Sequence, residues 1–176
     1  MAIDGRQHAP GESPSAAMGE IELDREVARL LRTRGVRLAV AESCTGGLMG
    51  HRVTSISGSS DYFLGGIIAY ANEVKVRELG VDARDIEQFG AVSEPVARGM
   101  AAGARRRFGA DVALGVTGIA GPEGGSRDKP VGLVFIGLAV DDGVRVRRFN
   151  LAGTRDEIKW RASSAALMML RDWLIN

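Results

Sequence analysis

The sequence predicts a three-layer α/β domain built on a mixed sheet. Short apolar segments alternate with amphipathic helical segments through the first two thirds of the chain. A turn-linked pair of strands and one long helical segment then close the chain. Alternation of strands and helices is typical of a sheet that helices cover, and a terminal hairpin adds antiparallel strands to it.

Length and composition fit one ordinary globular domain. The chain has 176 residues, of which 45% are hydrophobic and 26% are charged, and this length can bury a core without disulfides or metals. The net charge is +1, so the strong basic bias of nucleic-acid-binding proteins is missing. No apolar run approaches the roughly 20 residues that cross a bilayer. We therefore expect neither a nucleic-acid partner nor a membrane span.

The N-terminal stretch differs in composition from the rest of the chain. Residues 1–20 are rich in Gly, Pro, Ser and Ala and lack the apolar centre of a secretory signal. We expect a disordered tail there and a single domain over residues 21–176. Cys44 is the only cysteine, which excludes a disulfide framework and indicates a cytoplasmic location.

The first elements are a helix, a strand and a second helix. Apolar residues recur at helical spacing from Ile21 onward, and Gly35 is a suitable C-terminal stop. Segment 36–41 is a short apolar strand. The helix that follows it is expected to end at Gly58.

A second strand is predicted over 63–71, which is apolar and partly β-branched. The following helix starts at Asn72, a capping residue, and a weaker helical turn lies at 82–89. A longer helix starts at Ser93, whose hydroxyl can cap it and which precedes a proline tolerated in the first turn. Three consecutive arginines, 105–107, lie near its C-terminus. They suit the helix dipole there, so we interpret them as a solvated helix end in preference to a nucleic-acid contact.

The last third contains the remaining strands and a final helix. Segment 110–118 is a strand that breaks into a glycine-rich loop, and 131–140 is apolar throughout, as expected of a strand covered on both faces. A turn leads into a strand whose alternation breaks at Phe149, which predicts a bulge or the strand end there. Thr154 and Glu157 form a capping-box pair that starts the last helix.

The segment AESCTGG places Ser43 between a strand and a helix. Ligands gather at the C-terminal ends of strands in open α/β sheets, and a helix N-terminus offers unpaired N–H groups there. Gly46 and Gly47 let a ligand approach the backbone, so Ser43 has the attacking oxygen and oxyanion hole that acyl transfer needs. The alternative is a polar turn in which Thr45 caps the helix. Cys44 could be the nucleophile instead, although a small buried thiol is the more common outcome.

A nucleophilic serine needs a base, and lysine fits better than histidine. His8 lies in the predicted tail and His51 lies inside a helix with its ring directed away, which argues against a Ser-His-Asp arrangement. Lys75 lies in the first turn of the helix after the second strand, where burial and the helix dipole both favour the neutral amine. Tyr70 ends the same strand and could relay a proton or orient the amine. The alternative is a surface lysine paired with a nearby glutamate.

The remaining signals are weaker. GVTGIAGPEGGS offers an anion-friendly backbone, with Thr117 and Gly118 at the strand end. It matches neither a P-loop nor a dinucleotide fingerprint. One cysteine and two distant histidines give no zinc constellation, so no metal site is expected.

Five segments together resemble the C-terminal domain of the CinA family: AESCTGG, SGSSDYF, YANEVK, GAVSEPVA, and GVTGIAGPEGGS with KPVG. The resemblance covers roughly residues 22–175 and implies an α/β/α sandwich with a mixed, mainly parallel sheet. It also implies that the domain deamidates nicotinamide mononucleotide to nicotinate mononucleotide and ammonia, in pyridine nucleotide salvage, with no cofactor. We therefore expect this nucleotide as a small-molecule partner, and a homo-oligomer.

The resemblance also assigns residues. The catalytic serine, tyrosine and lysine of the family map onto Ser43, Tyr70 and Lys75. The substrate-binding positions map onto Thr45, Gly46, Gly47, Ser60, Thr117, Gly118 and Arg155. Arg155 lies in the first turn of the last helix, where a cation opposes the dipole; this suits a residue kept for phosphate, and the alternative is an ion pair with an acidic neighbour. Ala71 replaces a serine that is common in the family, which bears on rate or ligand choice.

These residues lead to one main hypothesis and two alternatives. In the main one, neutral Lys75, helped by Tyr70, takes the proton of Ser43, whose Oγ attacks the carboxamide carbon, and N–H groups of residues 45–47 hold the oxyanion. The first alternative is a non-catalytic pyridine-nucleotide-binding module that Ala71 has disarmed. The second is an amidase for another small amide.

Overall fold

The structure is a computed structural model that describes residues 14–176. Its elements follow in the order α1 (Pro14–Arg34), β1 (Leu38–Glu42), α2 (Leu48–Thr54), η1 (Ser59–Asp61), β2 (Phe63–Ile68), α3 (Asn72–Leu79), α4 (Ala83–Phe89), α5 (Glu94–Phe108), β3 (Val112–Gly118), β4 (Leu133–Val140), β5 (Gly143–Asn150) and α6 (Arg155–Ile175). α1 begins at Pro14, earlier than the expected Ile21. Residues 14–20 are therefore helical, and the rest of the predicted tail lies outside the described residues. Within residues 14–176, none of the helices combines the length and apolarity needed to cross a bilayer.

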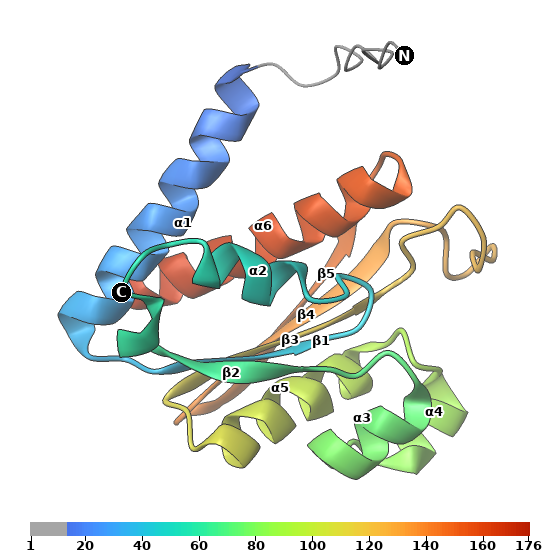
Figure 1. Cartoon of the computed structure of the whole chain (residues 1–176). Coiled ribbons are helices and arrows are strands. Elements are labelled where there is room, and N and C mark those ends of the chain that lie inside the picture. Colours follow the sequence, from blue (N-terminus) through green and yellow to red (C-terminus); the bar gives the residue numbers. More distant parts are fainter. Residues whose placement is uncertain (1–13) are drawn as a thin grey trace, which may run out of the picture.

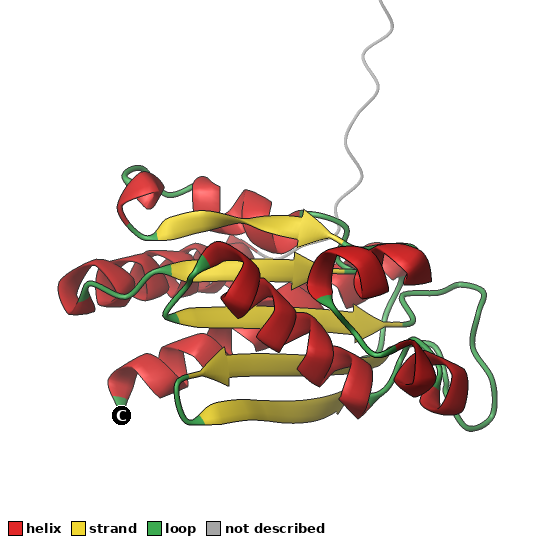
Figure 2. Ribbon diagram, turned by 90° about the horizontal axis from the view of Figure 1, so that it is seen from below, coloured by secondary structure: helices red, strands yellow, loops and turns green. Residues whose placement is uncertain are grey.

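In the described part of the chain, five strands form one sheet in the order β2-β1-β3-β4-β5. β1 pairs in parallel with β2 on one side and with β3 on the other. β4 runs antiparallel to β3, and β5 runs antiparallel to β4. Of these strands, β4 is therefore the one that is reversed (Figure 2). The predicted mixed sheet is confirmed, and the C-terminal hairpin supplies its antiparallel part.

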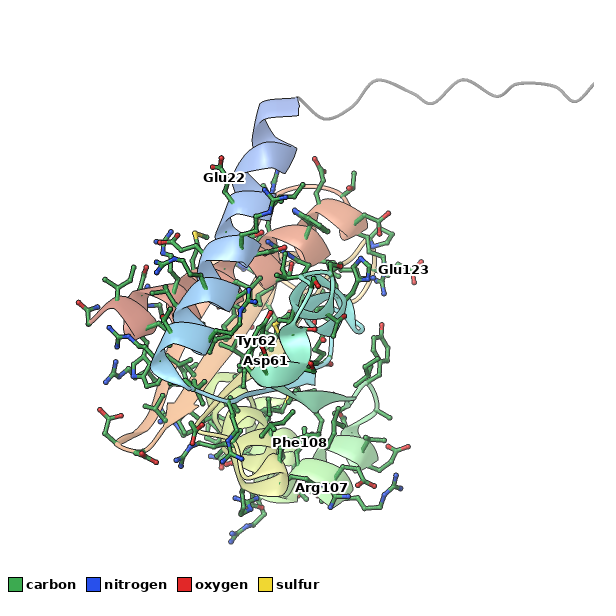
Figure 3. The ribbon with its side chains drawn as sticks, turned by 60° about the vertical axis from the view of Figure 1, so that its left-hand side comes forward. Glu22, Asp61, Tyr62, Arg107, Phe108 and Glu123 are labelled. Atoms are coloured by element: carbon green, nitrogen blue, oxygen red, sulfur yellow. The ribbon has the colours of Figure 1, made fainter. Side chains whose placement is uncertain are left out.

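Helices cover both faces of the sheet, which confirms the predicted α/β/α sandwich (Figure 1). α1, α2 and α6 lie over one face, and α3, α4 and α5 lie over the other. Each face has its own apolar core. Tyr62 belongs to the first core and Phe108 packs against the second, so the two rings lie on opposite sides of the sheet (Figure 3).

α5 lies close to the sheet because the strands beneath it carry very small residues. A Cβ on Gly115 of β3 would come within 2.5 Å of the backbone nitrogen of Ala101, and one on Gly137 of β4 within 2.7 Å of the carbonyl oxygen of Ala97. Interiors are close-packed, so a larger side chain at either position would push the helix outward. These glycines thereby also position the loop that enters α5, which borders the C-terminal edge of the sheet.

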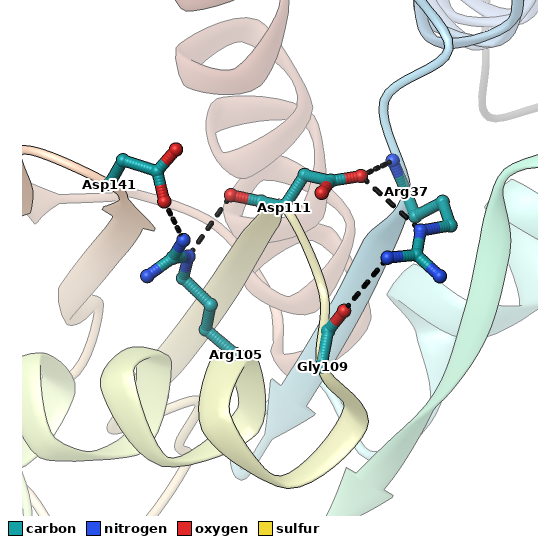
Figure 4. Close-up of polar contacts among 5 residues, drawn as sticks. All are labelled: Arg37, Arg105, Gly109, Asp111 and Asp141. Atoms are coloured by element: carbon teal, nitrogen blue, oxygen red, sulfur yellow. Dashed lines mark hydrogen bonds and ion pairs between the residues drawn. The ribbon is translucent and has the colours of Figure 1, made fainter.

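A polar network closes the opposite edge, where β1 and β3 begin (Figure 4). The carboxylate of Asp111 accepts a hydrogen bond from the backbone N–H of Arg37 at 2.7 Å and lies 3.4 Å from its Nε. Arg105 donates to the carbonyl of Asp111 at 3.0 Å and pairs with the carboxylate of Asp141. Arg107 contacts Glu78 at 3.2 Å. These arginine contacts agree with the interpretation of residues 105–107 as a helix end.

Of the two outcomes predicted at Phe149, the bulge is wrong, and the strand end lies one residue further on, at Asn150. Phe149 pairs with Val134 in a register that stays unbroken along β4 and β5. The change of pattern instead reflects which side of the strand is covered. Phe149 packs against the core under α1, α2 and α6, whereas the preceding Arg147 and Arg148 are exposed.

The helices start close to their predicted positions, but only some of the predicted cap hydrogen bonds form. Ser93 is the N-cap of α5, but its hydroxyl donates to the carbonyl of Gly90 at 2.8 Å instead of capping the helix. Asn72 is the first residue of α3, not its cap. The capping box of α6 is confirmed, since Thr154 and Glu157 exchange both side chain–backbone hydrogen bonds.

Candidate active site

The turn that carries Ser43 follows β1 directly and is held by a buried carboxylate. Glu42, the last residue of β1, is 2% exposed. Its carboxylate accepts hydrogen bonds from the N–H groups of Gly47, Met49 and Gly50 at 2.9, 3.1 and 2.9 Å. Such bonds are strong because the acceptor is charged and lies at a helix N-terminus. Glu42 therefore fixes the start of α2 relative to Ser43.

The same contacts change the expected oxyanion site. The N–H of Gly47 is taken by the carboxylate, and that of Gly46 donates to a carbonyl within the turn at 3.1 Å. Among the described residues, the N–H groups of Cys44 and Thr45 donate to no other residue, and that of Cys44 interacts with its own thiol. The expected Thr45 cap is also wrong. Gly47 occupies the N-cap, and the buried hydroxyl of Thr45 has no partner in the described structure.

Lys75 is buried at the neighbouring junction between β2 and α3. Its side chain is 1% exposed, and its Nζ donates to the carbonyl of Tyr70 at 2.9 Å. Burial lowers the pKa of Lys75 below its ordinary 10.5, and the negative charge of Glu73 opposes this only in part. Lys75 forms no ion pair with any described residue, and Glu78 pairs with arginines instead. The alternative of a surface lysine paired with a glutamate is therefore wrong.

Cys44 is a poor candidate for the nucleophile. Its thiol is buried so closely that a Cβ on Gly118 would lie 3.0 Å from Sγ. Burial raises the pKa of the Cys44 thiol to about 12. Because the thiolate is the reactive form, a thiol with this pKa is almost entirely unreactive at neutral pH. The chemistry of the turn therefore favours Ser43.

One cleft of about 200 Å³ brings the two junctions together. Its walls come from the turn after β1, the β2–α3 junction, the loop before α5, the end of β3 and the start of α6. The lining residues are Ser43, Cys44, Tyr70, Asn72, Lys75, Ala91, Val92, Thr117, Gly118, Ala120 and Arg155. The parallel strands end level with one another, because Glu42 pairs with Ile68 on one side and Val116 on the other. The serine and lysine junctions therefore share one edge of the sheet.

Arg155 and Tyr70 meet at the mouth of this cleft. The guanidinium of Arg155 donates to the carbonyl of Gly121 at 2.5 Å and to the hydroxyl of Tyr70 at 3.2 Å. Tyr70 is 62% exposed. Its hydroxyl thus contacts the arginine, and its main-chain carbonyl contacts Lys75. The alternative ion pair of Arg155 with an acidic neighbour is not formed within the described residues.

The loop before α5 forms a wall of the cleft that sequence reasoning missed. The Thr117 hydroxyl donates to the carbonyl of Ala91 at 2.8 Å, and Lys129 Nζ donates to that of Val92 at 2.9 Å. Ala91 and Val92 carry no polar side chain, so nothing in their identity marks them as part of a site. The available signals were their place just before the start of α5 at Ser93 and their membership of the family-like segment GAVSEPVA.

The predicted binding residues divide into three groups. Thr117, Gly118 and Arg155 line the cleft, whereas Thr45, Gly46 and Gly47 belong to the turn that borders it. Ser60 lies in η1, before β2, and does not line the cleft in this chain. The whole length of β2 separates it from the site edge, so the geometry does not support its assignment. The described residues also hold no group of three or more His, Cys, Asp and Glu side chains placed to bind a metal ion.

Comparison with known proteins gives a consistent family. Residues 20–174 match the CinA C-terminal domain. A CinA-like protein from Gemmatimonas aurantiaca is 58% identical over 138 residues, which cover 78% of this chain and 32% of that protein. A CinA-like protein from Geobacter sulfurreducens is 52% identical over 160 residues, covering 91% of this chain and 39% of that protein. The chain thus spans between about a third and two fifths of the length of these curated relatives.

A solved structure agrees over the full domain. The crystal structure of the competence/damage inducible protein CihA from Agrobacterium tumefaciens has a TM-score of 0.86 to this chain at 38% identity. The match covers 97% of this chain and 100% of that one. The chain therefore belongs to the CinA C-terminal domain family.

Proposed function

We propose that the chain is an amidohydrolase that converts nicotinamide mononucleotide and water to nicotinate mononucleotide and ammonia, a step of pyridine nucleotide salvage. The observation that carries this proposal is the cleft in which Ser43 lies together with a buried lysine that has no ion-pair partner among the described residues. A serine hydroxyl is a weak nucleophile until a base removes its proton, and a desolvated amine is such a base. Membership of the CinA family is consistent with amidase activity.

In the proposed acylation step, the neutral amine of Lys75 takes the proton of Ser43 while Ser43 Oγ bonds to the carboxamide carbon. The Tyr70 carbonyl accepts a hydrogen bond from the amine and so orients it. The N–H groups of Cys44 and Thr45 stabilise the negative charge that develops on the carboxamide oxygen. Lys75 then gives the proton to the leaving nitrogen, the C–N bond breaks and ammonia departs.

Water completes the cycle. A water molecule attacks the acyl carbon and gives its proton to Lys75, which is again neutral after the first step. The bond between the acyl carbon and Ser43 Oγ breaks, and Lys75 returns the proton to Ser43. The product is released as the carboxylic acid, which gives its remaining proton to the solvent and becomes nicotinate, so that the enzyme is restored and atoms and charges balance.

The mouth of the cleft suits a nucleotide. The guanidinium of Arg155 has the fork geometry that matches phosphate oxygens, and no described carboxylate competes for it. The exposed ring of Tyr70 offers its face to the cationic pyridinium of the substrate. Gly118 lines the cleft at the end of β3, and its missing side chain lets Cys44 and Val134 pack closely against this strand end.

Ala71 does not disarm this mechanism. It is the N-cap of α3 and makes no side-chain cap. A serine hydroxyl at an N-cap accepts a hydrogen bond from the first helical turn. The serine that is common in the family at this position is therefore expected to stabilise α3, and no step of the proposed reaction needs its hydroxyl.

The proposal is tested by ammonia release from nicotinamide mononucleotide. Ser43→Ala should abolish release, and Cys44→Ala, which alters the adjacent side chain of the same turn, should retain it. Unchanged release by Ser43→Ala would remove the acyl-enzyme scheme. Thermal stabilisation by the nucleotide without ammonia would favour a binding module, and ammonia from a different amide alone would favour another substrate.

A further inference from the structure

α6 directs two cations toward the site, of which the mechanism above uses one. Arg155 contacts the cleft mouth, and Lys159 lies one helical turn further along on the same side of α6. The Nζ of Lys159 lies 3.9 Å from the position that a Cβ on Gly46 would take. The lysine therefore reaches the turn that carries Ser43, while Arg155 contacts Tyr70 and Gly121 at the cleft mouth.

Arg155 and Lys159 differ from the other cations of α6 in having no ion-pair partner among the described residues. Arg161 pairs with Glu157 at 3.7 Å, and Arg171 pairs with Asp172 at 2.8 Å. Lys159 and Arg155 have no carboxylate partner within the described residues. The cations that face the serine turn are thus the unpaired ones of this helix.

This arrangement is unfavourable without an anion. Like charges one turn apart repel each other, and cations in the first two turns of a helix oppose its dipole. Gly46 has a φ of +62° and no side chain, so the backbone under the Lys159 amine is bare. Two unpaired cations over a bare turn are the features of a site that receives a negatively charged group.

We propose that Lys159 and Arg155 together bind the phosphate of the substrate, and that Lys159 is a specificity-determining residue for phosphorylated pyridine nucleotides over the corresponding nucleosides. The inference rests on the proposed function, since it names the group that this site recognises. A phosphate monoester carries close to two negative charges at neutral pH. Two cations therefore match its charge, with the guanidinium giving orientation and the ammonium acting as a point charge.

The test compares two substrates that differ only in the phosphate. Lys159→Met should lower kcat/KM for nicotinamide mononucleotide about 10- to 100-fold, mainly through KM, because it removes one charge-assisted contact to phosphate. The kcat/KM for nicotinamide riboside should stay unchanged. Arg171→Met, which removes a paired cation from the far end of the same helix, is the matched control and should change neither. An equal loss on both substrates, or no loss on the mononucleotide, would overturn the inference.

A binding measurement separates this inference from the proposed reaction. Inorganic phosphate should raise the Tm of the wild-type chain and raise it less in Lys159→Met. If the wild-type chain releases no ammonia from either amide and this difference in Tm persists, the anion site stands and the proposed reaction falls. If phosphate stabilises both proteins equally, or neither, the anion site is overturned whatever the activity.

Discussion

The two edges of the sheet treat their cations in different ways. At the edge where β1 and β3 begin, Arg37 and Arg105 both contact Asp111, through its carboxylate or its carbonyl (Figure 4). At the edge where β1, β2 and β3 end, Lys75 and Arg155 have no carboxylate partner among the described residues. The first edge satisfies its charges internally and serves the scaffold. The second edge leaves its cations without carboxylate partners, so they are available to bind a ligand. This difference distinguishes the candidate active site from the structural edge.

The same contrast recurs within the site, between its two strand–helix junctions. At the first junction, the buried anion Glu42 accepts three backbone hydrogen bonds. At the second, the buried cation Lys75 donates one, to the Tyr70 carbonyl. A buried charge is stable only when it is well hydrogen-bonded. The first junction is therefore held by three backbone contacts, whereas burial at the second lowers the pKa of Lys75 and so favours its neutral, reactive form.

The largest expected effect comes from removing the amine at the second junction. Lys75→Met should lower kcat for ammonia release about 10²- to 10⁴-fold, because the reaction loses its general base. The methionine fills the same buried space, so the fold should be retained, as circular dichroism would check. Arg37→Met, at the scaffold edge, is the control and should keep its activity. A fully active Lys75→Met enzyme would assign the base to another residue.

The next effect should be on stability and should arise at the first junction. Glu42→Gln replaces a charged acceptor of three backbone bonds by an amide whose NH₂ group faces N–H donors. We expect the free energy of unfolding to fall by about 2 kcal/mol, since buried donors lose their partner. Urea denaturation would measure it. Wild-type stability in this variant would mean that the Glu42 contacts are not what fixes the start of α2.

Much of the scaffold could be predicted from the sequence because its signals are local. The capping box of Thr154 and Glu157, the helix start at Ser93 and the order of strands and helices each depend on a few adjacent residues. The placement of Ser43 and Lys75 on one edge followed from the direction of parallel strands. The error at Phe149 arose because a pattern of exposure was read as a change in backbone pairing.

The rest of the site depends on contacts that no local pattern encodes. In the sequence, Glu42 is only a polar residue at a strand end. Its role depends on three N–H groups at and near the start of α2 that donate to its carboxylate in the fold. Tyr70 was expected to relay a proton or to orient the Lys75 amine. Its main-chain carbonyl contacts that amine, and the start of α6 brings Arg155 to its hydroxyl. Ser60 was assigned to substrate binding through the family resemblance. In the fold it lies at the opposite end of β2 from the cleft. Each of these outcomes is decided by segments far apart in the sequence.

A third prediction uses the pH dependence of stability to test the burial of Lys75. The pKa of Lys75 is lowered in the folded state, while the unfolded chain titrates near 10.5. Between these two values the unfolded state binds more protons, so stability rises with pH in that window. At any pH well below 10.5 the wild-type chain therefore bears a cost for burying the lysine, either as a buried charge or as the loss of a proton on folding. Lys75→Met should therefore be more stable than the wild-type chain at pH 7, by about 1 kcal/mol.

The excess stability of Lys75→Met should shrink as the pH rises through this window and vanish above 10.5, where the wild-type amine is neutral in both states. Urea denaturation at several pH values would measure this convergence. Arg37→Met should show no such change, since an arginine stays charged throughout. A difference that is constant with pH would mean that the lysine is not desolvated in the folded protein.

The smallest effect on stability is expected at the edge where β1 and β3 begin. Arg37 and Asp111 have side chains that are 53% and 46% exposed, and ion pairs with such exposure contribute at most about 1 kcal/mol. Asp111→Asn keeps an acceptor for the Arg37 N–H, so the loss in unfolding free energy should be about 0.5 kcal/mol, with ammonia release unchanged. Denaturation and the same ammonia assay would measure both quantities. A loss of activity as large as that of Lys75→Met would show that the paired edge is coupled to the cleft through the strands, because no atom of the network reaches the cleft directly.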